Sequence, residues 1–133
     1  MKPARLLHTM LRVGNLQRSV DFYTRIMSMK VLRTFERPDE KYTLVFVGCG
    51  DDSDTCVLEL TYNQGVSEHE TGNVYGHVAV GVDDCARACE YISSKGARII
   101  YGPEPLEETG EIIAFTEDPD CYRIELIEHA VSP

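Results

Sequence analysis

The sequence contains an internal duplication, and this repeat constrains the fold more than any other feature of the chain. When the sequence is shifted along itself by 69 positions, His8–Val13 aligns with His77–Val82. After a deletion of three residues in a loop, Val57–Leu60 aligns with Arg123–Leu126. Identity between the copies is low, but the matched positions are regularly spaced. The chain is therefore predicted to consist of two copies of one structural unit.

Each copy shows the same order of hydrophobic periodicities. A short strand-like run precedes residues at helical spacing, with Asn15 and the Asp83–Asp84 pair as candidate N-caps. Three runs rich in β-branched and aromatic residues follow, at about 30–36, 42–49 and 56–62, and again at about 97–101, 111–117 and 122–128. We therefore expect one α+β domain, 1–133, with βαβββ modules at about 5–63 and 75–130 and a hinge at about 64–74.

Length and charge limit the classes of function. A chain of 133 residues can bury a core without disulfides or a structural metal. Its net charge of −9 argues against nucleic acid or an anionic membrane as partner, because both attract clustered Lys and Arg. No apolar run approaches the ~18 residues of a membrane span, and the first residues lack the apolar core of a secretion signal. We therefore expect a cytoplasmic protein.

The duplication also pairs four metal-competent side chains. His8 matches His77 on the predicted first strands, and Glu59 matches Glu125 on the predicted last strands. Taken singly, each histidine is better explained as a core or edge residue, and each glutamate as part of a solvated strand face. Both glutamates, however, lie in apolar strands, where a charge needs a partner or a metal. Two imidazoles and two carboxylates facing one cavity would suit Ni²⁺, Co²⁺, Mn²⁺ or Zn²⁺, and spacing alone does not choose among them.

Four segments carry a resemblance to a known family, namely His8–Gly14, Val57–Asn63, Tyr75–His77 and Ala114–Glu125. They closely resemble the glyoxalase I (lactoylglutathione lyase) family of the vicinal oxygen chelate superfamily, and the resemblance covers nearly the whole chain. It implies that the two modules form an open barrel-like sheet, completed in a homodimer. Each site would combine the first His–Glu pair of one subunit with the second pair of the other, so the implied metal ligands are His8, Glu59, His77 and Glu125.

The resemblance also implies a reaction. The substrate would be the hemithioacetal of methylglyoxal and glutathione, and the product S-D-lactoylglutathione, formed through an enediol with negative charge on two adjacent oxygens. A divalent ion stabilises such charge as a Lewis acid, and a carboxylate moves the proton. Glu125 would take the proton from one hemithioacetal epimer and Glu59 from the other. A metal-bound hydroxide is a competing base.

Further residues and the metal are implied in the same way. Arg12 and Asn63 would hold the γ-glutamyl end of glutathione, while a surface salt bridge is an alternative role for Arg12. The wall around the methyl group of methylglyoxal, or equally plain core, would consist of Leu44, Phe46, Ile113 and Phe115. Only 14 positions separate Asn63 from His77, which resembles the short class activated by nickel or cobalt. Ni²⁺ is therefore expected, ahead of Co²⁺ and then Zn²⁺.

The chain departs from the family pattern at several positions. The segment Tyr101–Glu111 carries four glutamates where many relatives have basic residues near the glycyl carboxylate of glutathione. A cationic, polyamine-conjugated thiol such as trypanothione is the resulting alternative to glutathione. Ser28 and Cys121 stand where most relatives have glycine, so a positive φ at Cys121 would cost stability.

Other classes of function stay open at this point. Another vicinal oxygen chelate enzyme, such as an epimerase or an extradiol dioxygenase, would also bind a divalent ion, but a dioxygenase needs two histidines and a single carboxylate. A metal-free binding module of the same fold would lack the four-ligand set. A structural role without a ligand has the least support.

Overall fold

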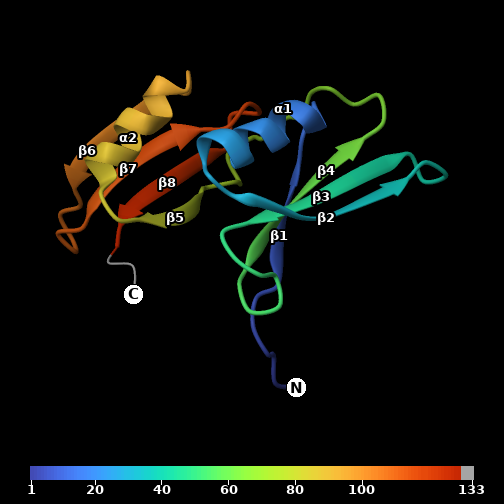
Figure 1. The fold of residues 1–133 in the computed structure, drawn as a ribbon, viewed down its shortest axis with the longest axis horizontal. Helices are drawn as coiled ribbons and strands as arrows, with labels where there is room; N and C mark the ends of the chain where they lie inside the picture. The colour runs from blue at the N-terminus through green and yellow to red at the C-terminus, as the bar shows by residue number, and fades with distance from the viewer. Residues whose placement is uncertain (130–133) are drawn as a thin grey trace. The chain divides into compact units, whose positions relative to one another are not determined.

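A computed structural model describes residues 1–129 (Figure 1). The chain divides into two compact units, Met1–His69 and a second unit that begins at Glu70. This boundary lies inside the predicted hinge at about 64–74, whereas residue 130, the predicted end of the second module, lies outside the described residues. Within residues 1–129, no helix is long and apolar enough to cross a membrane.

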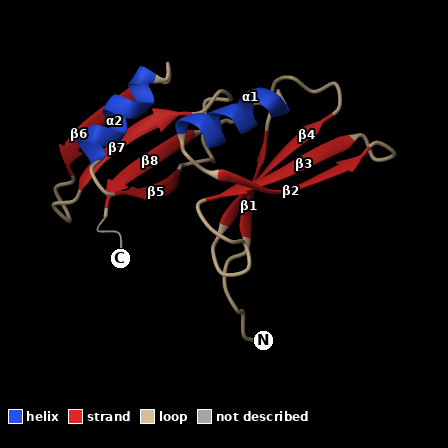
Figure 2. Ribbon diagram, in the orientation of Figure 1, coloured by secondary structure: helices blue, strands red, loops and turns tan. Residues whose placement is uncertain are grey.

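The first unit is a four-stranded mixed sheet with a helical segment after its first strand (Figure 2). Its elements are, in order, β1 (His8–Arg12), α1 (Leu16–Asp21), the π-helical turn η1 (Phe22–Ile26), β2 (Lys30–Arg37), β3 (Tyr42–Gly48) and β4 (Val57–Asn63). The strand order is β1-β4-β3-β2, with β1 parallel to β4 and the other pairs antiparallel. This is the predicted βαβββ order.

The second unit repeats the same topology. Its elements are β5 (Val78–Val82), α2 (Cys85–Ser94), β6 (Ile99–Pro105), β7 (Ile112–Glu117) and β8 (Arg123–Glu128). The strand order is β5-β8-β7-β6, and β5 runs parallel to β8 as β1 does to β4. The duplication and the α+β fold class are confirmed.

Both helices begin where the sequence predicts. The side chain of Asn15 accepts a hydrogen bond from the backbone N–H of Arg18 at 3.0 Å, and Asp84 accepts one from Arg87 at 3.1 Å. Each cap satisfies a backbone donor that has no partner within the helix. The sequence does not reveal that the first helix changes to π-helical geometry at Phe22, where Met27 donates to the Phe22 carbonyl.

Strand β6 is longer than expected. The sequence predicts a strand at about 97–101, but β6 continues to Pro105. A register shift between Tyr101 and Glu104 marks a bulge in its pairing with β7. Gly102 has φ 80°, and a Cβ at this position would collide with the carbonyl oxygen of Ile113. The glycine therefore permits the close approach of β6 to β7.

The alternation of side chains along β4 and β8 separates the core from the opposite sheet face. Leu60 on β4 and Ile124 and Leu126 on β8 are fully buried. Glu59 and Glu125 lie at the alternate positions and therefore point to the other face of their sheets. In each unit the core therefore lies on one face of the sheet, and the glutamate lies on the opposite face.

Among residues 1–129, three non-glycine residues have a positive φ, and two of them stand where most relatives of the resembled family have glycine. Ser28 has φ 60° and Cys121 has φ 69°. Both values lie in the left-handed region, where a side chain costs free energy that glycine avoids. The condition for the expected cost at Cys121, a positive φ, is therefore met, and the cost itself stays a prediction.

Candidate metal and active site

The first His–Glu pair lies on the two parallel strands of the first unit. In the register of β1 and β4, His8 is opposite Val57 and Met10 is opposite Glu59. The side chains of His8 and Glu59 meet on one face of the sheet, with Nε2 and Oε1 3.4 Å apart. The histidine side chain is 39% exposed and the glutamate 16%. A partly exposed imidazole and a mostly covered carboxylate thus face each other.

The second unit contains the matching pair. His77 directly precedes β5, so it lies one residue outside the strand on which it was predicted. Its Nε2 lies 3.2 Å from Oε1 of Glu125 on β8, and the two side chains are 43% and 12% exposed. The distances and exposures are close to those of the first unit. The repeat therefore preserves the geometry of the pair as well as the residue types.

An aromatic ring supports each histidine. The ring centroids of His8 and Phe46 are 5.4 Å apart with an interplanar angle of 79°, and those of His77 and Phe115 are 5.3 Å apart at 83°. Edge-to-face packing of this kind restricts how the imidazole can rotate. Two residues predicted as apolar wall thus contact the predicted ligands directly.

A second ring completes each cluster, and sequence reasoning missed both. Phe35 on β2 packs on Phe46, and Tyr101 on β6 packs on Phe115, each with centroids 6.3 Å apart. The two rings are 66 positions apart. The general offset between the halves is 69 positions, so an alignment with a three-residue deletion between the second helix and the strand that follows it would have paired Phe35 with Tyr101.

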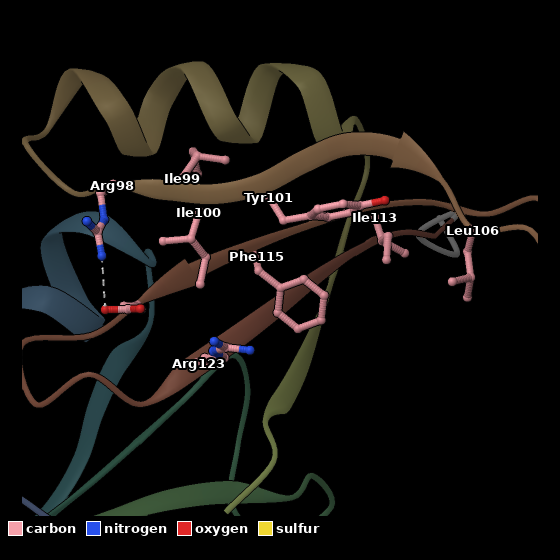
Figure 3. Close-up of a pocket in the computed structure, with 9 residues that line it drawn as sticks. Arg98, Ile99, Ile100, Tyr101, Leu106, Ile113, Phe115 and Arg123 are labelled. Carbon is pink, nitrogen blue, oxygen red and sulfur yellow. Dashed lines mark hydrogen bonds and ion pairs between the residues drawn. The ribbon is translucent and has the colours of Figure 1, made fainter. Parts of the chain in front are cut away.

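A cavity of about 780 Å³ borders this cluster in the second unit (Figure 3). The rings of Tyr101 and Phe115 and the side chain of Ile113 line it, and the ion pair of Arg98 with Glu117 (3.5 Å) lies at one end. A surface that is apolar in the middle and charged at the end suits a small organic ligand with polar groups. Ile113 is itself buried and Phe115 half-buried, so the predicted roles as core and as wall coexist here.

The corresponding positions of the first unit combine both roles as well. Phe46 is buried, and Leu44 is half-buried opposite Thr61. The guanidinium of Arg33 lies 4.2 Å from the centroid of the Phe46 ring, and its Nε is 2.7 Å from Oδ2 of Asp52. This cation over the ring was not predicted, because nothing in the local sequence pattern distinguishes Arg33.

The two predicted substrate-binding residues occupy the ends of the parallel strands. Arg12 is the last residue of β1 and pairs with Thr61, and Asn63 is the last residue of β4. Because β1 and β4 run parallel, both residues lie at the same edge of the sheet. Arg12 is exposed and Asn63 half-buried.

The segment that leads into His77 is fixed by Tyr75. Its hydroxyl donates a hydrogen bond to the backbone carbonyl of Arg123 at 2.9 Å, and its ring packs on Tyr122 with centroids 4.9 Å apart. Burial, followed by the nearby carboxylate of Asp118, raises the pKa of Tyr75 to about 12. The phenol therefore stays protonated and keeps its hydrogen bond throughout the neutral range.

The two His–Glu pairs offer side-chain types that bind divalent ions, with one imidazole and one carboxylate from each unit. Imidazole nitrogen and carboxylate oxygen together are ligands for borderline ions such as Ni²⁺, Co²⁺ and Zn²⁺. Among the described residues, no three His, Cys, Asp or Glu side chains gather in one group. Each pair by itself thus offers half of the four predicted ligands.

The fold and the paired donors define a duplicated βαβββ protein with one His–Glu pair in each copy. Residues 5–126 match the model of the Glyoxalase/Bleomycin resistance protein/Dioxygenase superfamily, and the chain belongs to this family. It is 55% identical to the lactoylglutathione lyase of Escherichia coli O157:H7 over 124 residues. This alignment covers 93% of this chain and 92% of the relative.

Solved structures show the same relationship. Glyoxalase I from Zea mays superimposes with a TM-score of 0.93 at 43% identity, over 97% of this chain and 46% of the maize chain. The chain thus spans about half the length of the maize protein. The trypanothione-dependent glyoxalase I of Leishmania major superimposes with a TM-score of 0.86 at 46% identity, over 94% of this chain and 86% of that one.

Proposed function

We propose that this chain is a lactoylglutathione lyase that isomerises the hemithioacetal of methylglyoxal and glutathione to S-D-lactoylglutathione. The observation that carries the proposal is the duplicated His–Glu pair, with 3.4 Å and 3.2 Å between the facing atoms. The 55% identity to a lactoylglutathione lyase over 93% of the chain supports the same reaction. A dioxygenase uses a single carboxylate, and a metal-free binding module needs no ligands, so neither class accounts for two matching His–Glu pairs of this geometry.

The four paired side chains would hold one divalent ion. The family implies a metal, which when bound stabilises negative charge on the two adjacent oxygens of the substrate. His8 and His77 would contribute Nε2, and Glu59 and Glu125 would contribute Oε1. Each imidazole is already oriented by an aromatic ring, so little conformational freedom has to be lost on binding.

Glu125 is our proposed general base. Its side chain is only 12% exposed, which keeps water away from the carboxylate while one oxygen faces His77. The oxygen that is turned away from the imidazole can accept the proton from the substrate carbon and return it to the neighbouring carbon. Glu59 would serve the other hemithioacetal epimer. A carboxylate placed in this way contributes about 10²- to 10⁴-fold to such a proton transfer.

We propose that Arg12 and Asn63 bind the γ-glutamyl end of glutathione. Both lie at the edge where β1 and β4 end, and together they offer a guanidinium and an amide to a carboxylate. The methyl group of methylglyoxal would lie against Leu44, Phe46, Ile113 and Phe115. The rings of Phe46 and Phe115 contact the two histidines, which supports a place for the methyl group beside the metal.

A specific observation favours a second thiol. The hairpin between β6 and β7 carries exposed carboxylates at Glu104, Glu107, Glu108 and Glu111, and Leu106 between them lines the cavity of the second unit. Negative charge at this place would attract a cationic, polyamine-conjugated thiol such as trypanothione. The ratio of kcat/KM for the glutathione and trypanothione hemithioacetals decides between the two thiols. We expect glutathione to be preferred.

The remaining parts of the proposal are the metal, the assembly and the location. We propose Ni²⁺ as the activating ion, with Co²⁺ as the alternative and Zn²⁺ as the weaker activator. We also propose a cytoplasmic homodimer in which the first His–Glu pair of one subunit and the second pair of the other share one ion.

The test is an assay of thioester formation from methylglyoxal and glutathione after the protein has been stripped with a chelator. Adding back Ni²⁺ should restore turnover far better than adding back Zn²⁺. Ni²⁺ that binds without restoring turnover with either thiol would refute the proposed reaction. Equal or better activity with Zn²⁺ would keep the reaction and refute the proposed metal class.

A further inference from the structure

The two glutamates of the duplicated site differ in one contact. Thr61 follows Glu59 by two residues on β4, points to the same face and is 8% exposed. Its hydroxyl donates a hydrogen bond to Oε2 of Glu59 at 2.9 Å, while Oε1 faces Nε2 of His8 at 3.4 Å. Both carboxylate oxygens of Glu59 therefore have a partner within their own unit, which holds the carboxylate in one orientation.

The second unit lacks this hydrogen bond. The repeat aligns Thr61 with Ile127, two residues after Glu125 on β8, and isoleucine has no donor. Oε1 of Glu125 faces His77 at 3.2 Å, and the side chain of Ile127 offers no hydrogen bond to its Oε2. The backbone register is the same in both units, since Met10 pairs with Glu59 and Ala79 with Glu125. The difference therefore lies in the side chain and not in the fold.

We propose that Thr61 is a positioning residue that holds the Glu59 carboxylate in its orientation toward the metal, and that Ile127 leaves the Glu125 carboxylate free to rotate. This inference rests on the proposed function, because it assigns different mobility to two carboxylates that the duplication made equivalent. The hydroxyl of a β-branched residue has few rotamers, so Thr61 loses little entropy in making the bond. A bond to an ionised oxygen is also among the stronger hydrogen bonds.

Metal affinity tests the role of Thr61 without any need for turnover. Thr61→Val keeps the shape of the side chain and removes the donor, and loss of an outer-shell partner typically weakens metal binding about 10- to 100-fold. In calorimetric titration of the metal-free protein with Ni²⁺, we expect at least ~10-fold weaker binding for Thr61→Val. Thr61→Ser keeps the donor and should stay within roughly 3-fold of wild type.

A Thr61→Val protein that binds Ni²⁺ as tightly as wild type would overturn the inference. So would a Thr61→Ser protein that is as impaired as Thr61→Val, because packing rather than the hydroxyl would then be responsible. Wild-type protein that binds Ni²⁺ but shows no turnover would refute the proposed function while the affinity comparison still tests the hydrogen bond. A wild-type protein that binds no divalent ion would overturn both.

The reciprocal variant tests the freedom of Glu125. Ile127→Thr places a hydroxyl where Thr61 has one in the first unit, so it should restrain the proposed base. We expect kcat to fall roughly 10-fold at saturating Ni²⁺, with Ni²⁺ affinity unchanged or tighter. General damage to the site would instead weaken affinity and kcat together, and that result, or an unchanged kcat, would refute the role of Ile127.

Discussion

Glu125, the proposed general base, is the residue at which proton transfer can be tested separately from metal binding. Glu125→Gln keeps an oxygen that can face the ion but removes the group that accepts a proton. We expect kcat to fall about 10²- to 10⁴-fold while the protein retains its metal. The measurement is the rate of thioester formation together with the metal content of the purified variant. Normal turnover with metal bound would exclude Glu125 as the base.

Cys121 contributes strain that can be removed by a single substitution. Its φ of 69° is one that glycine adopts freely and that costs a residue with a side chain of order 1–2 kcal/mol. Part of that gain is offset, because glycine has more freedom in the unfolded chain. We expect Cys121→Gly to raise the free energy of unfolding by about 1 kcal/mol, measured by urea denaturation.

Ser28→Gly is the matched control, because Ser28 has φ 60° and lies in the other unit. If backbone strain is the cause, both variants gain stability in the same direction. A loss of stability in both would show that contacts of the side chains outweigh the strain.

At the scale of elements, helix α2 determines which thiols of the chain can react. Cys85 and Cys89 lie one turn apart on its buried face, while Cys49, Cys56 and Cys121 are exposed. Burial raises the pKa of Cys85 to about 11 and also raises the pKa of Cys89. A raised thiol pKa lowers the fraction of reactive thiolate at any pH below it.

Thiol titration with Ellman's reagent at pH ~8 should therefore show two classes. We expect Cys49, Cys56 and Cys121 to react in the native protein, and Cys85 and Cys89 only after denaturant is added. Replacing Cys85 and Cys89 with alanine should leave the native count unchanged. Five thiols that react at one rate in native protein would show that α2 does not stay packed on its sheet.

Features that repeat in the sequence could be predicted, whereas features that depend on contacts between strands could not. The His–Glu pairs could be predicted because repetition matches residue types, and alternation along a strand then assigns them a common face. The extension of β6 could not, because a glycine next to a proline suggests a loop until the close approach to Ile113 is seen. The hydrogen bond from Thr61 to Glu59 was also missed, since a threonine in a strand ordinarily reflects β propensity.

At the scale of the whole molecule, the repeat gives each unit one His–Glu pair, which is half of the proposed donor set. The repeated βαβββ unit carries two matching His–Glu pairs, each packed against its own aromatic ring. Combining two such pairs gives four ligands with no new loop or strand. In the proposed homodimer, each ion would therefore be bound by residues of two different chains. Mixing two inactive variants and measuring the activity that returns tests this arrangement.

Complementation between two inactive variants is the decisive test of the shared site. If each site uses the first pair of one chain and the second pair of its partner, a heterodimer of His8→Ala and His77→Ala has one site with both defects and one intact site. With equal amounts and free exchange, half of the dimers are mixed, so about a quarter of wild-type activity should return. The control is a mixture of His8→Ala with Glu59→Ala, whose defects fall in the same pair and leave no intact site. Activity that returns in neither mixture would show that each site is built within one chain.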